Sequence, residues 1–130
     1  MIDHAKKGYP NEACGILAGA AKDSASVFFP MKNMDEATIS YFMEPKEQLL
    51  VFKEMRQKGL EMRGIFHSHV ASEAYPSEKD VQLAFYGDAK TEIFPEASYL
   101  IVSLSNMSKP VLRSFHINEK KVTEEEIKIT

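Results

Sequence analysis

Two histidines separated by one residue are the side chains of this sequence best suited to hold a metal ion. His67 ends the run MRGIFH, which has the composition of a β-strand, and His69 follows two residues later. Side chains alternate between the two faces of a strand, so both imidazoles project to one side while Ser68 points to the other. A metal site built in this way needs a third ligand from elsewhere in the chain.

Asp80 is the best candidate for the third ligand. It lies in the first turn of a helix that we expect to begin at Ser77, after a short loop that follows His69. Two histidines and one carboxylate leave one tetrahedral position of a zinc ion open, which is typical of catalytic rather than structural zinc. A water molecule there would have a pKa of about 7 and could act as a nucleophile at neutral pH. The pattern therefore predicts a zinc hydrolase.

Such a hydrolase also needs a group that moves protons. A carboxylate beside the metal-bound water can take its proton and later pass it to the leaving amine, and Glu12 fits this role on chemical grounds. Nothing in the local spacing brings Glu12 to the two histidines. Its position depends on the fold, and a lone glutamate is far more often a surface carboxylate.

The same residues also have purely structural explanations. An isolated His-x-His is often just two exposed or hydrogen-bonded histidines. Ser77 and Asp80 have the spacing of a capping box, in which each side chain satisfies a backbone N–H at the start of a helix. An aspartate committed to a cap would compete with metal binding. The single cysteine, Cys14, is interpreted as a small buried residue without a chemical role.

Composition restricts the class of protein. The chain has 130 residues, 44% of them hydrophobic, and a formal net charge of -3, which fits a single domain over residues 1–130 and offers no basic surface for nucleic acid. One cysteine excludes an internal disulfide and any zinc site built from paired cysteines. No apolar run reaches the roughly 20 residues of a membrane span, and the N-terminus lacks a signal-peptide pattern. We expect a cytoplasmic protein without membrane contact.

The elements that must position these residues follow from hydrophobic periodicity and turn signals. Strands are expected at residues 13–20, 24–32, 39–43, 61–67, 97–104 and 110–117, and helices at residues 2–7, 45–59 and 77–85. The tail, residues 122–129, is either an edge strand or frayed. Gly64 marks a point of close approach. This order predicts an α/β or α+β sandwich, with helices outside a mostly antiparallel mixed sheet.

A family resemblance supplies the placement of Glu12. Glu12 just ahead of the strand ACGILAG, followed later by H-S-H, seven residues, S, two residues and D, resembles the JAMM (MPN-plus) metalloprotease family. The resemblance covers most of the chain and implies the cytidine-deaminase-like JAB/MPN architecture. It implies that His67, His69 and Asp80 bind Zn²⁺, that Glu12 is the general acid/base, and that Ser77 supports the tetrahedral intermediate. The family cleaves amide or isopeptide bonds at the C-termini of ubiquitin-like proteins.

One position departs from the family pattern. Members usually have proline directly after the second histidine, whereas this chain has Val70, which implies a less rigid loop. The short loops leave no room for the insertions that grip ubiquitin in deubiquitinating members. The chain is more similar to compact prokaryotic members, some of which act on the Gly-Gly end of ubiquitin-like sulfur carriers. The expected partner is therefore a ubiquitin-like or sulfur-carrier protein, and a homo-oligomer is compatible with the sequence.

Two other functions compete with this hypothesis. One is a metal-free scaffold or binding module on the same fold, although such members typically lack one or more of the ligands that this chain keeps. The other is a zinc amidase that acts on small peptides and differs only in its cleft. A comparison of cleavage rates on short peptides and on protein conjugates would separate this amidase from a peptidase that acts on a carrier protein.

Overall fold

One mixed sheet forms the centre of the protein. The computed structural model describes residues 1–21, 24–33, 43–83, 97–118 and 121–128. The strands are β1 (Cys14–Gly19), β2 (Val27–Met31), β3 (Glu61–His69), β4 (Ser98–Ser103), β5 (Val111–Asn118) and β6 (Lys121–Glu125). Their order is β2-β1-β3-β4-β5-β6, and of the described pairs only β3 and β4 run parallel. The expected mostly antiparallel mixed sheet is confirmed.

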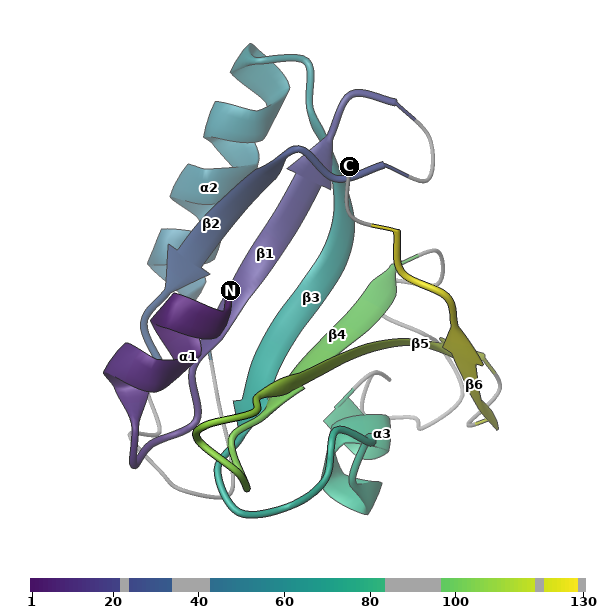
Figure 1. Ribbon diagram of the computed structural model, residues 1–130. Helices are drawn as coiled ribbons and strands as arrows, with labels where there is room; N and C mark the ends of the chain where they lie inside the picture. The colour runs from purple at the N-terminus through teal and green to yellow at the C-terminus, as the bar shows by residue number, and fades with distance from the viewer. Residues whose placement is uncertain (22–23, 34–42, 84–96, 119–120, 129–130) are drawn as a thin grey trace.

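Helices cover both faces of this sheet. The helices are α1 (Ile2–Gly8), α2 (Pro45–Gln57) and α3 (Glu78–Leu83). In Figure 1, α1 lies in front of the sheet and α2 behind it. Helix α2 begins where the sequence predicts, because Pro45 fits the first turn and Glu44 accepts the backbone N–H of Glu47. Gly59 follows its end with a φ of 68°, a conformation that favours glycine. None of the described helices has the length and apolarity to cross a lipid bilayer.

The alternation of β3 divides the core into two layers. Ile65 packs in the cluster that contains Val51 and Met55 of α2, whereas its neighbour Phe66 packs in the cluster that contains Ala5 of α1. Odd-numbered residues of β3 therefore face α2. This parity determines which face of the sheet His67 and His69 share.

Most of the expected elements are confirmed, with small differences at their ends. The strand expected at 61–67 extends to His69, and the tail forms β6 at the edge of the sheet. Of the strand expected at 39–43, only Met43 is described, and it forms an isolated bridge with Asn33. Residues 39–42 and the last two residues of the helix expected at 77–85 lie outside the described residues.

Gly64 allows the close approach that the sequence suggested. A Cβ atom at this position would lie 2.8 Å from Leu100 Cδ1 and 3.0 Å from the backbone oxygen of Ser98. Both contacts come from β4, which pairs with this stretch of β3. The glycine therefore lets β3, β4 and the side chain of Leu100 pack tightly, shortly before the two histidines in the strand.

Candidate metal centre

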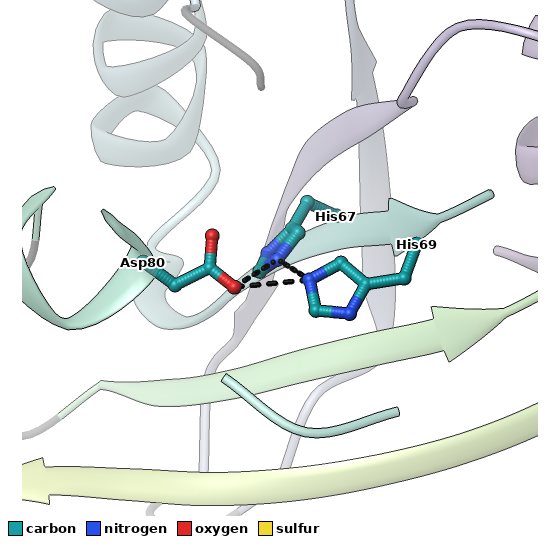
Figure 2. A group of neighbouring side chains, drawn as sticks. All are labelled: His67, His69 and Asp80. Carbon is teal, nitrogen blue, oxygen red and sulfur yellow. Dashed lines mark hydrogen bonds and ion pairs between the residues drawn. The ribbon is translucent and has the colours of Figure 1, made fainter. Parts of the chain in front are cut away.

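Three side-chain atoms from β3 and α3 converge on one point. The Nε2 atoms of His67 and His69 are 3.0 Å apart, and each lies 3.0 Å from Oδ2 of Asp80. Figure 2 shows both rings turned toward the carboxylate. All three residues are buried. The predicted group is thus assembled as the spacing suggested, and among the described residues it is a group that could hold a metal ion.

The position of each group follows from its element. His67 and His69 share the α2 face of β3 because they are two residues apart, and Val81 of α3 packs against the same core layer. The loop at residues 70–76 returns the chain to this face, so that α3 begins beside the end of β3. Asp80, on α3, therefore reaches the histidines on the face of the sheet that α2 covers.

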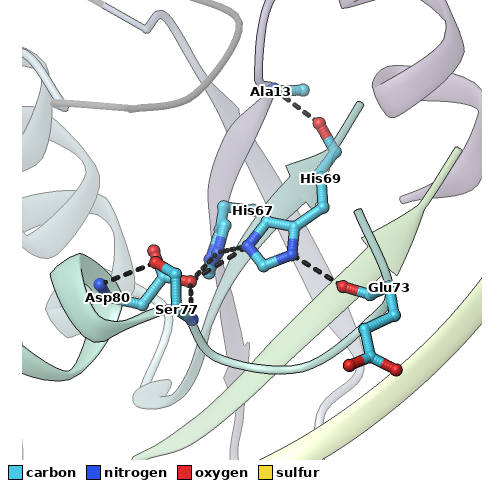
Figure 3. Close-up of polar contacts among 7 residues, drawn as sticks. Ala13, His67, His69, Glu73, Ser77 and Asp80 are labelled. Atoms are coloured by element: carbon cyan, nitrogen blue, oxygen red, sulfur yellow. Dashed lines mark hydrogen bonds and ion pairs between the residues drawn. The ribbon is translucent and has the colours of Figure 1, made fainter. Parts of the chain in front are cut away.

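Hydrogen bonds orient the ring of His69. Its Nδ1 lies 2.8 Å from the backbone oxygen of Glu73, as shown in Figure 3, so the proton on Nδ1 is donated to this carbonyl. With Nδ1 committed to this carbonyl, Nε2 is the ring nitrogen that would give its lone pair to a metal ion. Burial lowers the pKa of His69, but its hydrogen bonds with Asp80 and Glu73 outweigh burial and raise the pKa overall.

The pKa values of the other two groups, His67 and Asp80, are both lowered, but for different reasons. Burial lowers the pKa of His67 and outweighs the effect of its hydrogen bond to Asp80, so the neutral imidazole is favoured. Burial alone would raise the pKa of Asp80, but hydrogen bonds from His67 and His69 hold it well below its usual range. A carboxylate and a neutral imidazole are the protonation states that bind a divalent cation.

Ser77 and Asp80 form a capping box at the start of α3. Asp80 N–H donates to Ser77 Oγ over 3.1 Å, and Ser77 N–H donates to Asp80 Oδ2 over 2.8 Å (Figure 3). The structural explanation of this spacing is therefore correct. It is compatible with the metal-site interpretation, because a carboxylate oxygen has two lone pairs, and Oδ2 accepts the N–H of Ser77 while it faces the two imidazoles.

Glu12 is brought to the same face by the pairing of β1 with β3. Cys14 is the partner of His67 in the register, and Glu12 precedes Cys14 by two residues, on the side toward His69. Its side chain is buried, with 5% of its surface exposed, and Oε1 has no hydrogen-bond partner among the described residues. Burial raises the pKa of Glu12 to about 7, with the charges of His69 and Asp80 also acting on it. This long-range pairing could not be found from local spacing.

Comparisons with known proteins agree with this arrangement. A family model described as prokaryotic homologs of the JAB domain matches residues 1–118. The chain belongs to the prokaryotic JAB family. The resemblance to the JAMM family stated from the motif is thereby confirmed, and with it the expected class of fold.

Relatives of this JAB domain include named enzymes. The CysO-cysteine peptidase of Mycobacterium tuberculosis (strain ATCC 25618 / H37Rv) is 38% identical over 130 residues, which cover 99% of this chain and 84% of that protein. A desampylase of Pyrococcus furiosus is 38% identical over 71 residues, 55% of this chain and 50% of that protein. A solution structure of a Desulfitobacterium hafniense protein matches with a TM-score of 0.85 and 41% identity, covering 100% of this chain and 86% of that one. This JAB domain is a peptidase of the JAMM type.

Residues outside the motif also hold the site of this JAB domain. Ser103 Oγ donates to the backbone oxygen of Ser72 over 2.6 Å, and Ala74 is buried against Phe115 and its neighbours. These contacts anchor the loop that contains Glu73. They show how a loop with Val70 in place of proline is held, and no sequence signal marks Ser103, because a serine within an apolar strand has many roles.

Cys14 lies in the core beside this site, as the sequence interpretation expected. It is fully buried, and its Sγ lies 3.8 Å from the backbone oxygen of Met31. Burial, with the nearby charges of Glu47 and Glu12, raises the pKa of the thiol to about 12. A thiol that stays protonated is a poor nucleophile and a poor metal ligand, so Cys14 acts as packing.

Proposed function

We propose that this JAB domain is a zinc peptidase that hydrolyses the amide or isopeptide bond following the C-terminal Gly-Gly of a ubiquitin-like or sulfur-carrier protein. The observation that carries this proposal is the convergence of His67 Nε2, His69 Nε2 and Asp80 Oδ2 within 3.0 Å of one another. Three atoms with lone pairs repel one another at this distance unless protons or a cation lie between them. A divalent cation satisfies all three at once.

The donor set fits zinc. Zinc lies about 2.0–2.2 Å from nitrogen and oxygen ligands, so the ligand atoms of a tetrahedral site are about 3.3 Å apart. Separations of 3.0 Å need only a small outward shift of the two rings and the carboxylate. His67, His69 and Asp80 would hold the ion with one position left open. Bound zinc would polarise the scissile carbonyl and lower the pKa of a bound water.

Glu12 is proposed as the general acid/base. A carboxylate with a pKa of about 7 can both accept and donate a proton near neutral pH, which is the property that this role requires. Its buried Oε1, which has no partner among the described residues, is available to a water or an amine in the site. Glu12 would take a proton from the attacking water and deliver it to the amine nitrogen of the leaving group.

Ser77 is proposed to stabilise the oxyanion of the tetrahedral intermediate. Its Oγ accepts the N–H of Asp80, so the direction of the hydroxyl is fixed while its own proton can be donated to a substrate oxygen. Ser77 also fixes the start of α3. Its two roles use different parts of the same hydroxyl.

The substrate class rests on the names of relatives. A peptidase named for CysO-cysteine and a desampylase both point to a protein conjugate rather than to a free peptide. An extended tail would add to a sheet edge near the site, and glycines pass a narrow cleft where larger residues do not. The metal-free scaffold is the weaker alternative, because all three ligand residues are present and already converge.

Metal analysis and a cleavage assay test the proposal. The protein is purified without chelator, and three probes are compared: a Gly-Gly-terminated ubiquitin-like carrier with a C-terminal cysteine, the same carrier joined to a lysine side chain, and a short Gly-Gly-cysteine peptide. We expect about one zinc per chain and cleavage of a protein probe after Gly-Gly. Faster cleavage of the short peptide would favour the small-amide hydrolase. Protein without zinc and without cleavage of any probe would contradict the proposal.

The variant His69→Ala provides the matched control for this assay. Loss of one imidazole should remove both the zinc and the cleavage, whereas Ser108→Ala, in the exposed turn between β4 and β5 where Ser108 bonds to Asn106, should change neither. Equal activity of His69→Ala and the parent chain would show that the cleavage arises elsewhere.

A further inference from the structure

The peptide group between Glu12 and Ala13 is held on both sides by side chains. Its carbonyl oxygen accepts a hydrogen bond from Asn33 Nδ2 over 2.8 Å, and its N–H donates to Ser68 Oγ over 2.8 Å. Ser68 is fully buried, and Asn33 is half-buried two residues after the end of β2. Both polar atoms of this one peptide group are therefore fixed by side chains, one from β3 and one from the segment that follows β2.

The bond to Ser68 replaces a bond of the sheet. In the register of β1 with β3, Cys14 faces His67, so Ala13 falls opposite Ser68. Ser68 N–H donates to the backbone oxygen of Ala13 over 2.9 Å, as in an antiparallel ladder. The return bond from Ala13 N–H goes to the hydroxyl of Ser68 instead of its backbone oxygen. Strand β1 thus begins at Cys14, and the peptide group just before it is oriented by the side chain of Ser68.

The direction of the Glu12 side chain depends on this peptide group. Rotation of the group changes the ψ angle of Glu12 and swings its Cα–Cβ bond relative to β3. Oε1 of Glu12 has no hydrogen-bond partner among the described residues, so that oxygen does not itself fix the carboxylate. The backbone beside Glu12 therefore helps to set where the carboxylate points.

We propose that Ser68 and Asn33 are positioning residues, which aim the carboxylate of Glu12 at the site formed by His67, His69 and Asp80 by fixing the Glu12–Ala13 peptide. The proposal rests on the proposed role of Glu12. Under this proposal Ser68, the residue between the two histidines, has a functional role that differs from theirs. Ser68 points away from the proposed metal and acts on the catalytic carboxylate through the backbone.

Substitution of Ser68 tests the proposal on activity. With the carrier–cysteine conjugate as substrate, Ser68→Ala should lower kcat about 10- to 100-fold with little change in KM, since a misplacement of about 1 Å can cost this much. Zinc content should stay at the level of the parent chain. Ser68→Thr, which keeps the hydroxyl, should restore most of the activity. A proportional loss of zinc, or no rescue by threonine in a folded protein, would overturn the proposal.

A double substitution separates positioning from general loosening. If Ser68 acts through Glu12, then Ser68→Ala should cost less than about twofold in single-turnover rate when Glu12 is already glutamine. A structural defect would lower the rate in both backgrounds. Asn33→Leu, which keeps the volume and removes the donor, should behave like Ser68→Ala. Ser114→Ala serves as the matched control, because Ser114 is a buried serine of β5 that bonds to Glu125.

Amide exchange tests the positioning without any catalysis. In the protein as purified, the N–H of Ala13 should exchange slowly, and Ser68→Ala should speed its exchange at least about tenfold while distant amides of β4 and β5 stay protected. Unchanged exchange of Ala13 would overturn the proposal whatever the activity shows. Faster exchange in a protein that cleaves none of the probes would instead mean that the proposed function fails while Ser68 still holds the peptide.

Discussion

The carboxylate of Asp80 accepts the backbone N–H of Ser77 through Oδ2, the same oxygen that faces the two imidazoles. The start of α3 and the direction of the third candidate ligand are therefore fixed by one interaction. The N–H of Ser77 holds this oxygen in place at 2.8 Å. A hydrogen bond to a ligand atom of this kind orients the ligand before a metal arrives.

Removal of the cap should therefore weaken both the helix and the site. Ser77→Ala deletes the acceptor for Asp80 N–H and should lower the free energy of unfolding by about 1 kcal/mol. It should also lower kcat on the carrier conjugate, because the proposed donor to the oxyanion is lost. Denaturant unfolding and steady-state kinetics measure the two effects. Ser77→Thr keeps the hydroxyl and should retain the stability; the same loss in the threonine variant would show that the hydroxyl is not responsible.

Glu12→Gln should separate metal binding from turnover. The amide keeps the size of the side chain and cannot accept and release a proton, so kcat should fall by about 10²- to 10⁴-fold while zinc stays bound. Metal analysis and the conjugate assay check this in the same sample. Glu61→Gln, at an exposed carboxylate of β3, is the control and should leave both unchanged. Parent-like turnover of Glu12→Gln would exclude Glu12 as the acid/base.

Burial of Glu12 should make the stability of the zinc-free protein depend on pH. Its pKa is about 7 in the folded chain and 4.5 ordinarily, so folding favours the protonated acid. This stabilising contribution is complete below about pH 4.5, declines as the pH rises, and is lost above about pH 7. Between pH 5 and 8 the free energy of unfolding should fall by roughly 2 to 3 kcal/mol on account of this one group.

Denaturant unfolding of the chelator-treated protein at several pH values measures this decline. Other groups titrate in the same range, so the informative quantity is the difference between the parent chain and Glu12→Gln. The variant has no carboxyl group at this position and should lose less stability over the same pH range. Equal pH dependence of the two proteins would mean that Glu12 is not buried as described.

The anchor of the loop should matter for metal affinity. Ser103→Ala removes the hydroxyl that holds the backbone oxygen of Ser72, next to the carbonyl of Glu73 that orients His69. Loss of such outer contacts weakens zinc binding about 10-fold or more. Competition with a chromogenic chelator measures the affinity, and Ser108→Ala in the exposed turn is the control. Unchanged affinity would show that the loop holds its position without Ser103.

The sequence predicted those parts of the site that depend on short-range geometry. His67 and His69 share a face because of strand alternation, and Ser77 with Asp80 at helix-start spacing predicts the box that is observed. The bounds of α2 follow from Pro45 and Gly59. Each of these predictions uses interactions within about ten residues, for which periodicity and capping rules are sufficient.

Periodicity and capping rules could not predict the contacts between residues that lie on different strands. The burial of Glu12 beside the histidines arises from the pairing of Cys14 with His67, and its placement required the family resemblance. The roles of Ser68 and Asn33 arise from bonds to a peptide group 55 and 21 residues away. Serine and asparagine occur widely at strand ends and turns, so their types alone do not mark these positions.

Because side chains alternate along the end of β3, the site depends on the exact register in which β3 pairs with its neighbouring strands. Within residues 67–69, the outer two point toward α3 and the middle one toward the opposite layer of the core. A slip of the central strand by a single position would put a hydroxyl where an imidazole must be and send both rings into the wrong layer. Misregistered chains would then lack hydrolytic capacity altogether, so the peptidase can act only after its sheet has closed correctly.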